Sequence, residues 1–572
     1  MKRLLAFILC IIIFVSVISF NSSALPSVPA NPIMKIGIEY NNNRHFYSKI
    51  KNEKSWPYEF GYIDNNRNFV KLYETFSDEY YISIVEDKTF YHDTVKGLLG
   101  PNSSDGDKRL YNAHLQSSNT FSSYSSVKDK VKEYRNKGID CFPCYVNGTY
   151  RIRFGNYSSV DKANSDKSNM QSKTGLTLTA FGNDGNTVTV YDMKNDRIMF
   201  EHSDSKTFAF RTVKKDGEES VIIKYNTHIS PSSTRKFRGA FTYRRINGGA
   251  FEIISVVSMQ DYLKGVVPNE MSPSWPLEAL KAQAITARNL AANSYLSSRH
   301  SSYSFDMCDT THCQAYYGCA KESENTVKAV DQTYGQVLTY NDQIAKIYYY
   351  ASNGGYSESA KNAWGGTDYP YLQPVPDDME DKYLTDFYET KWSVTATPSQ
   401  ISDSLRKRGY DIAGTIKNLS ILSTTKPAGN VYEVSIIDGN NIETKIKTTD
   451  KVRLALSDYV KSPRFKLLKS PGVFLQSGRE QSAGFIGSKM YALTDGGAKY
   501  IDYGNVKLKA IDGDGKVKEV SSFETKYTFD GSGWGHNVGM SQHGAVGRAK
   551  AGHTCAQILE YYFKGTKVQT LK

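Results

Sequence analysis

One carboxylate stands out in the segment YLKGVVPNEMSP, where Glu270 follows an apolar run and precedes a long helical pattern. A positioned carboxylic acid can protonate the leaving oxygen of a glycosidic bond. The pattern predicts that Glu270 lies near the N-terminal end of the following helix, whose dipole favours a charged carboxylate. An acid there would need an apolar wall, for which the candidates are Val266, Val267, Met271 and Trp275. Taken alone, a solvated carboxylate near a helix start is the commoner situation.

A second chemically capable group lies in the segment CDTTHCQ. Cys308, His312 and Cys313 place two thiols and an imidazole within six residues, and zinc prefers these ligand types. A fourth ligand has to come from elsewhere, such as His300 or water. A Cys308–Cys313 disulfide is the alternative in an exported protein. We expect a structural role for a metal here, because acid catalysis at Glu270 needs no Lewis acid.

Several other polar groups are candidates for binding a ligand. Gln314 follows the cysteine–histidine segment and could direct its amide at an acetamido group, and Arg288 lies on a cationic edge of the long helix. The glycine-rich segment GSGWGHNVGMSQHGAVG predicts tight turns and an exposed backbone. It offers Trp534 as a platform for a sugar ring. The hydrogen-bonding candidates are His536, Ser541 and Gln542 from this segment, and Ser352, Asn353 and Gly354 from the segment SNGG. Glycines that only pack a helix against a sheet are an equal alternative.

The elements that position these groups predict an α+β fold. From residue 111 the patterns predict the order βαββαβ, with a strand pair turning at Asn147-Gly148 and a polar second helix from Ser159. The first of these helices is expected to bury Val127, Val131 and Tyr134. Further strands lead to the apolar strand FEIISVVSM and the helix PLEALKAQAITARNLAANSYL.

Within residues 108–192, the stretch FSSYSSVKDK is echoed by FGNYSSVDKA. This pair resembles the SPOR domain, a family of small peptidoglycan-binding modules. The resemblance implies binding of glycan strands stripped of their stem peptides. An unrelated ferredoxin-like domain remains the alternative, because split βαβ arrangements host many functions.

A longer series of motifs covers about residues 222–572: DYLKGVVPNEM, LKAQAITARN, CDTTHCQAYYG, YYYASNGGYSESAKNAWGG, PYLQPVPD and GWGHNVGMSQHGA. In this order they strongly resemble the SpoIID/LytB (stage II sporulation protein D) family. The resemblance implies a mixed α/β catalytic domain of a peptidoglycan lytic transglycosylase, with Glu270 as its acid and a zinc ion at the cysteine–histidine segment. Small departures are Pro268-Asn269 before Glu270, and Asn537 and His543 in the glycine-rich segment.

The chemistry of this family makes a single carboxyl sufficient. Glu270 would protonate the bond between N-acetylmuramic acid and N-acetylglucosamine, and the sugar's own C6 hydroxyl would close an anhydro ring. The internal nucleophile has a high effective concentration, so no second carboxylate need activate water. Asp306 and Asp309 are the candidate partners if the enzyme hydrolyses instead. The alternative from another class is a non-catalytic LytB-like protein that binds the wall and enhances an amidase.

Composition and the first residues predict export. Lys2 and Arg3 precede an apolar run over residues 4–20, which is typical of a signal peptide cleaved after Ala24 or, if uncleaved, of a membrane anchor. The formal charge of +12 is scattered, which argues against nucleic acid and suits a polyanionic cell wall. The expected partners are glycan strands and an N-acetylmuramoyl-L-alanine amidase, with no organic cofactor. Six cysteines outside the leader are too few for a disulfide scaffold, and Cys141 and Cys144 receive no function.

The expected organisation has four parts. Residues 1–24 form the signal peptide, and residues 25–107 form a small β-rich region that ends in the linker PNSSDGD. Residues 108–192 form the SPOR-like glycan-binding domain. Residues 193–572 form the SpoIID/LytB-like catalytic domain, and the whole protein is expected in the cell wall or outside the cell.

Overall fold

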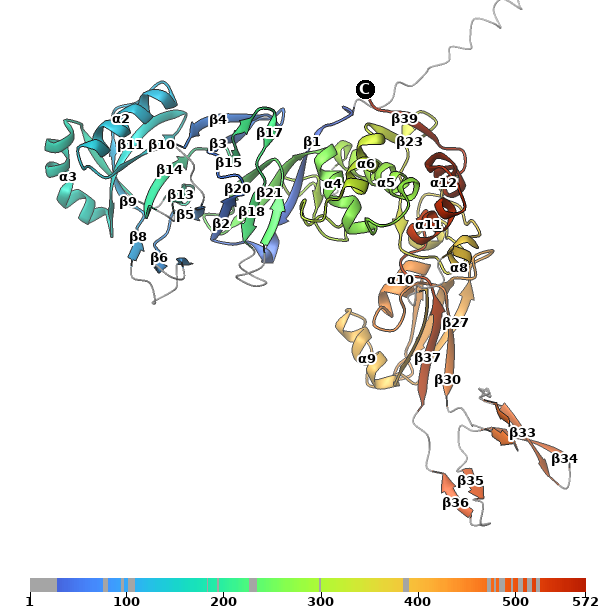
Figure 1. The fold of residues 1–572 in the computed structure, drawn as a ribbon. Helices are drawn as coiled ribbons and strands as arrows, with labels where there is room; N and C mark the ends of the chain where they lie inside the picture. The colour runs from blue at the N-terminus through green and yellow to red at the C-terminus, as the bar shows by residue number, and fades with distance from the viewer. Residues whose placement is uncertain are drawn as a thin grey trace, which may run out of the picture. The chain divides into compact units, whose positions relative to one another are not determined.

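The computed structural model describes residues 28–572, apart from 76–80, 94–96, 101–107, 183, 193–194, 226–233, 298–299, 384–389, 471–474, 478–479, 483–488, 495–496, 503–507, 512–516 and 521–524 (Figure 1). The expected signal peptide and the linker at 101–107 lie outside these residues. In the described part of the chain, none of the helices is long and apolar enough to cross a membrane.

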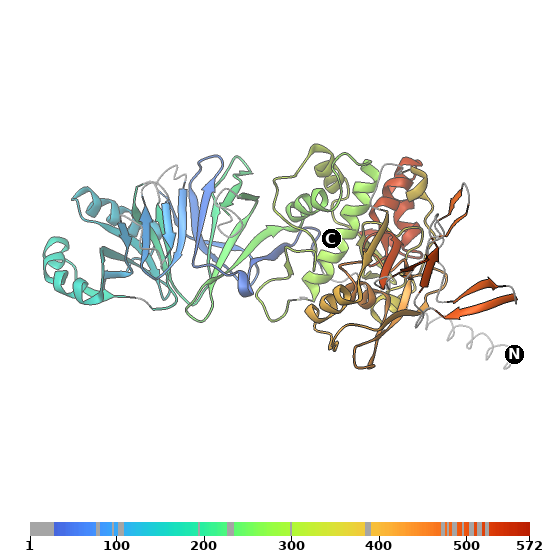
Figure 2. The ribbon, with the colours of Figure 1, turned by 90° about the horizontal axis from the view of Figure 1, so that it is seen from below.

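The chain divides into two compact units (Figure 2). The N-terminal unit comprises residues 28–274, 287–336 and 570–572 of the described chain, and the C-terminal unit comprises residues 275–286 and 337–569. Both units mix helices with largely antiparallel sheets, which confirms the α+β class. Each unit is described by itself below.

The N-terminal unit contains a seven-stranded sheet in the order β22-β1-β21-β20-β15-β3-β4. Apart from the parallel pair of β1 and β22, neighbouring strands are antiparallel. The strands are β22 (Met307–Cys308), β1 (Ile33–Glu39), β21 (Phe251–Ser258), β20 (Ala240–Arg245), β15 (Phe208–Thr212), β3 (Tyr58–Ile63) and β4 (Phe69–Glu74). The apolar strand FEIISVVSM is thus β21, inside this sheet.

A ten-stranded sheet in the same unit has the order β12-β9-β11-β10-β14-β13-β5-β2-β18-β19. The strands are β12 (Leu178–Phe181), β9 (Ala113–Ser117), β11 (Thr149–Tyr157), β10 (Cys141–Val146), β14 (Arg197–Ser203), β13 (Val188–Asp192), β5 (Tyr81–Glu86), β2 (Tyr47–Asn52), β18 (Ile222–Tyr225) and β19 (Thr234–Phe237). Smaller pieces are η1 (Asn41–Asn43), the sheet of β6 (Phe90–Asp93), β7 (Gly97–Gly100) and β8 (Lys108–Leu110), and the pair β16 (Lys214–Lys215) and β17 (Glu218–Glu219).

The order predicted from residue 111 is present as β9, α2 (Tyr124–Asn136), β10, β11, α3 (Val160–Thr174) and β12. Helix α2 buries Val127, Val131 and Tyr134, and Ser159 caps α3 by accepting a hydrogen bond from the Lys162 N–H group. The β10–β11 turn has φ angles of 46° at Asn147 and 81° at Gly148, which Asn and Gly tolerate best. The sheet order β12-β9-β11-β10 is that of a split βαβ fold, but β10 also pairs in parallel with β14, so the sheet continues beyond this segment.

The two sheets pack against each other through aromatic side chains. The ring of Phe200 on β14 stacks with Tyr73 at 5.2 Å and with Phe60 at 5.7 Å between centroids, and both partners belong to the other sheet. The Tyr150 hydroxyl donates to the Leu72 carbonyl across the same interface, at 2.7 Å. Alternation along strands places these rings on one face of each sheet, so the core of the unit lies between them.

Helices follow the seven-stranded sheet directly. α4 (Met259–Glu270) begins where β21 ends, and Ser258 caps it by accepting a hydrogen bond from the Asp261 N–H group. Six residues separate α4 from α5 (Leu277–Leu296), and α6 (Glu324–Gln332) packs on α4. Near the end of the chain, the Leu571 N–H group donates to the Gly335 carbonyl and the Ala30 N–H group donates to the Lys572 carbonyl.

The C-terminal unit is built from several small sheets and short helices. The sheets are β24 (Gln343–Ile344), β23 (Gln336–Tyr340) and β39 (Lys567–Thr570); β25 (Tyr349–Tyr350) and β38 (Met540–Ser541); β26 (Lys391–Ala396), β37 (Lys526–Ser532) and β30 (Phe465–Ser470); and β27 (Asn418–Thr424), β28 (Val431–Ile437) and β29 (Glu443–Lys447). The helices are α7 (Ala360–Trp364), α8 (Met379–Tyr383), α9 (Pro398–Lys407), α10 (Thr449–Ala455), α11 (Gln542–Lys550) and α12 (Cys555–Tyr562). Three hairpins, β31 (Leu475–Ser477) with β32 (Glu480–Ser482), β33 (Lys489–Thr494) with β34 (Gly497–Asp502), and β35 (Leu508–Ile511) with β36 (Val517–Val520), complete it.

Candidate functional site

Glu270 is the last residue of α4 and does not lie at the start of α5. The predicted helix polarity is therefore wrong, because the apolar run before Glu270 is itself helical despite Pro268. The C-terminal end of a helix carries partial negative charge from its unpaired carbonyls, which disfavours a second negative charge. The half-buried side chain follows the buried Val266 and Val267, so the expected apolar surroundings are supplied by its own helix.

A backbone hydrogen bond orients the Glu270 carboxyl group. The Ala315 N–H group donates a hydrogen bond to Glu270 Oε1 at 3.0 Å. The segment that carries Ala315 can approach α4 because of Gly265, where an added Cβ atom would lie 2.8 Å from the Gly318 carbonyl oxygen. A glycine in α4 thus allows the loop after the cysteine–histidine segment to reach the candidate acid.

The neighbouring Gln314 holds two helices together. Its side chain is 1% exposed, and its Oε1 atom accepts a hydrogen bond from the Tyr262 hydroxyl at 3.0 Å. Its Nε2 atom donates to the Ala287 carbonyl of α5 at 3.3 Å. The amide that sequence analysis assigned to an acetamido group is therefore engaged within the core, where it fixes the loop next to Ala315.

Arg288 does not form the expected cationic edge. The side chain is fully buried, and its Nη1 atom donates to the Gln336 carbonyl at 3.1 Å and its Nη2 atom to Gln260 Oε1 at 3.4 Å. Burial lowers the pKa of Arg288 to about 10. The prediction failed because helical spacing shows which residues share a face but not whether that face meets solvent.

The structure brings together the four residues that sequence analysis named as metal ligands. The nitrogen and sulfur atoms of His300, Cys308, His312 and Cys313 all lie within 4.8 Å of one another, and three of the residues are buried. His300 Nε2 is 3.2 Å from Cys313 Sγ, and His312 Nδ1 is 3.6 Å from both sulfurs. In the described chain no disulfide joins the two cysteines. Two thiols and two imidazoles at one point fit the ligand set of a tetrahedral zinc site.

The local chemistry also favours thiolate. The hydrogen bond with the Cys313 thiol lowers the pKa of the Cys308 thiol to about 3. Thiolate is the form that binds metal. Cys308 is the last residue of β22, which pairs in parallel with β1 at Ile36 and Gly37. A strand of the seven-stranded sheet therefore holds one side of the cluster.

The two acidic residues around β22 are both held by arginines. Asp306 accepts hydrogen bonds from the Arg67 guanidinium, at 2.9 Å to Oδ1, and from the Lys35 N–H group, at 2.9 Å to Oδ2. Asp309 Oδ2 accepts from Arg235 Nη1 at 2.8 Å. Both residues are buried. These ion pairs fix the segment that carries the cluster.

The C-terminal unit holds the remaining candidates around a buried carboxyl that sequence analysis missed. Glu380 accepts hydrogen bonds from the Ser352 hydroxyl at 2.7 Å, from the Asn353 N–H group at 3.1 Å and from the Ser541 hydroxyl. Asp377 accepts from Asn353 Nδ2 at 3.1 Å. The segments SNGG and GMSQHG, nearly 190 residues apart in the chain, are thus tied together by two carboxyls. Only the position of Asp377 in the motif PYLQPVPD hinted at this network.

The other binding candidates in this unit differ in exposure. Trp534 is 41% exposed, and Lys461 Nζ lies 4.2 Å from the centre of its ring. His536 packs among Tyr350 and Trp364, its Nδ1 atom accepts from the Val538 N–H group at 3.0 Å, and burial lowers its pKa to about 4. Gln542 is 6% exposed, and its Nε2 atom donates to Gln283 at 3.4 Å. Trp534 therefore has exposed ring surface, which a sugar platform needs, although Lys461 lies over the ring.

A glycine of the SNGG segment allows close backbone packing in the same region. Gly354 has a φ angle of 63°, and an added Cβ atom would lie 2.7 Å from the backbone carbon of Ser532. This glycine thus has the structural role that sequence analysis kept as an alternative. The candidates fall in two sets: Glu270, Arg288, Gln314 and the cysteine–histidine cluster belong to the N-terminal unit, and the SNGG and glycine-rich residues belong to the C-terminal unit.

We expect the buried Glu380 to make the stability of the C-terminal unit depend on pH. Burial and the nearby Asp377 raise the pKa of Glu380 from 4.5 to about 7. A carboxyl whose pKa is raised by folding contributes stability below its unfolded pKa and loses it as the pH rises through the folded value. Unfolding followed from pH 4.5 to 7.5 should show this loss, and Glu380→Gln should reduce the slope. Glu560→Gln, an exposed change in the same unit, should retain the slope; a Glu380→Gln slope equal to that of the unaltered protein would contradict the prediction.

Comparison with known proteins shows that part of the chain matches the model of a protein family. Residues 247–340, which include α4, Glu270 and the cysteine–histidine cluster, match the family model described as Stage II sporulation protein. With the motifs quoted above, the match confirms the predicted resemblance of this part of the chain to the SpoIID/LytB family. The SPOR-like resemblance of residues 108–192 stays a prediction.

Curated relatives agree with this placement. The amidase enhancer of Bacillus subtilis (strain 168) is 32% identical over 323 residues, which cover 53% of this chain and 40% of the relative. The stage II sporulation protein D of the same organism is 25% identical over 342 residues, covering 57% of this chain and 77% of the relative. That of Bacillus amyloliquefaciens is 24% identical over 330 residues, covering 54% and 74%. The match thus spans less than half the length of the amidase enhancer.

Proposed function

We propose that this protein is a cell-wall lytic transglycosylase that cleaves the bond between N-acetylmuramic acid and N-acetylglucosamine in peptidoglycan stripped of its stem peptides. The observation that carries this proposal is the oriented Glu270 carboxyl group, which ends a helix and receives the Ala315 N–H group at 3.0 Å. The family match covers this segment. A general acid has to be positioned, and the Ala315 N–H group orients the Glu270 carboxyl group at the C-terminal end of α4.

In the proposed reaction, Glu270 serves first as acid and then as base. Its proton goes to the glycosidic oxygen as the bond to C1 of N-acetylmuramic acid breaks and an oxocarbenium-like state forms. The resulting carboxylate accepts the proton of the C6 hydroxyl, whose oxygen bonds to C1 and closes the 1,6-anhydro ring. The Ala315 N–H group stabilises the carboxylate between these steps, since hydrogen bonds to ionised acceptors are stronger than neutral ones.

The surroundings of β22 support transglycosylation over hydrolysis. A hydrolase needs a second carboxylate to activate water or to act as nucleophile. Asp306 and Asp309 were the candidates, and both are buried in ion pairs with Arg67 and Arg235. A buried carboxylate whose oxygens are already bonded to an arginine is not placed to bind and activate a water molecule.

We also propose that His300, Cys308, His312 and Cys313 hold a structural zinc ion. Zinc bound there would join the loop after α5 to β22. Cys313 is followed directly by Gln314 and Ala315, so fixing Cys313 also fixes the N–H group that orients Glu270. The four residues thereby position the acid without taking part in proton transfer.

The remaining expectations fit the same proposal. Trp534, exposed in the C-terminal unit, would stack on a sugar of the strand, and the SPOR-like segment 108–192 would bind glycan. We propose export to the cell wall, which the apolar run over residues 4–20 and the basic charge support. An N-acetylmuramoyl-L-alanine amidase would supply the peptide-free strands.

The identity of the product tests the proposed reaction class. Purified protein incubated with peptide-free glycan strands in ¹⁸O-labelled water should release products that end in 1,6-anhydro-N-acetylmuramic acid, because the C6 hydroxyl replaces water as nucleophile. Mass spectrometry should find no label in these ends. Reducing ends that carry ¹⁸O would show a hydrolase and overturn the transglycosylase assignment.

An amidase enhancer is the second candidate, because the 32% identical relative from Bacillus subtilis bears that name. A protein of this class would release no products from any glycan but would accelerate wall digestion by an added amidase. The Glu270→Gln variant separates the two candidates, since enhancement by binding alone should survive the loss of the acid.

A further inference from the structure

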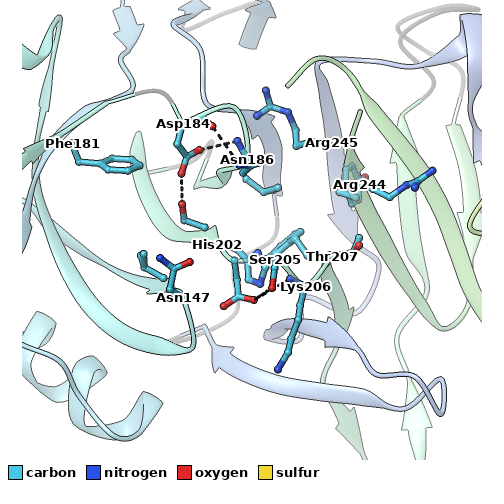
Figure 3. A pocket seen from close by; sticks show the side chains of 16 residues that line it. Asn147, Phe181, Asp184, Asn186, His202, Ser205, Lys206, Thr207, Arg244 and Arg245 are labelled. Carbon is cyan, nitrogen blue, oxygen red and sulfur yellow. Dashed lines mark hydrogen bonds between the residues drawn. The ribbon is translucent and has the colours of Figure 1, made fainter. Parts of the chain in front are cut away.

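A polar cavity of about 600 Å³ lies within the N-terminal unit, outside the candidate catalytic site (Figure 3). Residues of four chain segments line it: 146 and 147 at the β10–β11 turn; 181, 184, 186 and 188; 202–208 from the end of β14 to the start of β15; and 243–245 at the end of β20. The volume falls in the range of small-ligand pockets, about 300–1,000 Å³. Only the first two segments belong to residues 108–192, so the cavity exists only where the SPOR-like segment meets the rest of the unit.

The cations around this cavity are already neutralised or directed elsewhere. Arg245 forms ion pairs with Asp87 at 2.6 Å and with Glu86 at 3.3 Å, and Arg244 pairs with Glu252 at 2.8 Å. Lys206 Nζ donates to the Tyr62 hydroxyl at 3.1 Å and lies over its ring. Figure 3 shows the side chains of Arg244 and Lys206 pointing away from the centre of the cavity. The site therefore does not attract a phosphate or another anion.

Two carboxylates shape the loops of the cavity. Burial alone would raise the pKa of Asp184, but hydrogen bonds from the Ser203 hydroxyl and from two backbone N–H groups outweigh it and lower the pKa to about 2. Asp204 accepts from the Gly148 N–H group at 2.8 Å and from the Lys206 N–H group at 3.0 Å. These hydrogen bonds fix both loops. The two ionised carboxylates are acceptors, which suit the hydroxyl groups of a ligand.

An aromatic ring and an amide face the same space. The Arg153 guanidinium lies 3.6 Å from the centre of the Phe181 ring and holds that ring, and Figure 3 shows Phe181 and Asn147 pointing into the cavity. Asn147 and Ser205 are exposed. His202, 1% exposed, lines the cavity, and its Nε2 atom has no hydrogen-bond partner among the described residues. An apolar ring face bordered by amides, hydroxyls and carboxylates matches a pyranose, which has an apolar face and a rim of hydroxyls.

We propose that this cavity binds a neutral saccharide unit of a glycan strand, with Phe181 against the sugar face and Asn147 and Ser205 at its polar rim. The site is independent of Glu270 and goes beyond the glycan binding assigned to residues 108–192. Ten of the sixteen lining residues lie outside that segment, so binding depends on more of the N-terminal unit than residues 108–192.

Binding of chitotetraose, a neutral oligomer of N-acetylglucosamine, to the full-length protein tests this proposal. Titration calorimetry should detect binding, and Phe181→Ala should weaken it by about tenfold or more, since an aromatic platform is lost. Asn147→Gly keeps the left-handed turn but removes the amide, and should weaken binding about fivefold. Asn341→Gly is the matched control, because Asn341 is also an exposed turn residue with a positive φ of 49°. It should bind as the unaltered protein does.

The possible outcomes separate clearly. Equal binding by Asn147→Gly, Phe181→Ala and the control would show that the sugar binds elsewhere and would overturn the proposal. Absence of chitotetraose binding, or its displacement by inorganic phosphate, would overturn the neutral saccharide as ligand. Phe181→Ala also removes a contact of Arg153, so its far-ultraviolet circular dichroism spectrum has to equal that of the unaltered protein. If the two spectra differ, the binding result for Asn147→Gly decides the test. Loss of strand cleavage in Glu270→Gln leaves this binding unchanged, so the two proposals fail separately.

Discussion

Glu270→Gln is expected to lower the rate of glycan strand cleavage by about 10²- to 10⁴-fold, the usual cost of losing a positioned general acid. Glutamine has nearly the same shape and can still accept the Ala315 N–H group through its carbonyl oxygen. It cannot donate a proton of suitable acidity to the glycosidic oxygen. The expected measurement is a turnover assay on peptide-free glycan, with the release of anhydro ends followed by mass spectrometry.

The matched control for this variant is Glu324→Gln, which removes an exposed carboxylate from the same unit at the start of α6. Its turnover should equal that of the unaltered protein. Both variants should retain the melting temperature of the original, because glutamine keeps nearly the size and shape of the glutamate side chain and Glu324 is exposed. If Glu270→Gln retained most of its activity, Glu270 would not be the acid.

Removal of the cysteine–histidine cluster should have the largest effect on stability. Purified protein is expected to contain about one zinc ion per chain, and the double variant Cys308→Ser, Cys313→Ser should contain none and should melt at a lower temperature. Binding of a structural metal contributes directly to the free energy of folding. Cleavage should also fall, because the loop that carries Ala315 would lose its anchor. Metal analysis measures the zinc content, and calorimetry measures the melting temperature.

Cys319→Ser serves as the control, because this half-buried cysteine lies outside the cluster. It should retain the zinc and nearly all of the stability. A metal-free native protein with a Cys308–Cys313 bridge in peptide mapping would instead support the disulfide. A chelator should reproduce the loss of stability in the unaltered protein and leave Cys308→Ser, Cys313→Ser unchanged.

The cluster illustrates what a sequence can reveal about a site. Cys308, His312 and Cys313 are close in the chain, so their shared position follows from local geometry, and His300 is near enough to be a reasonable fourth member. Glu270 was also identified from its motif, but its place on a helix was predicted wrongly. The pattern placed Glu270 near the start of the following helix, whereas the structure continues α4 through Pro268 to Glu270.

Burial explains most of the remaining differences. Arg288 and Gln314 have side chains that often bind ligands, yet both lie in the core and bond to backbone carbonyls there. Glu380 gave no signal, because its partners Ser352 and Ser541 are distant in the chain and a single acidic residue is usually exposed. The βαββαβ order was predictable from local periodicity, but the parallel pairing of β10 with β14 depends on contacts between distant segments.

That parallel pairing has a practical consequence for how the protein can be divided. Residues Cys144 to Val146 of β10 pair with Glu201 to Ser203 of β14, so cutting the chain after residue 192 would expose an unpaired strand edge with a row of unsatisfied N–H and C=O groups. Such edges promote intermolecular association. Residues 108–192 are therefore poorly suited to be produced or transplanted as an independent module, and a boundary placed beyond β21 would retain the complete sheet.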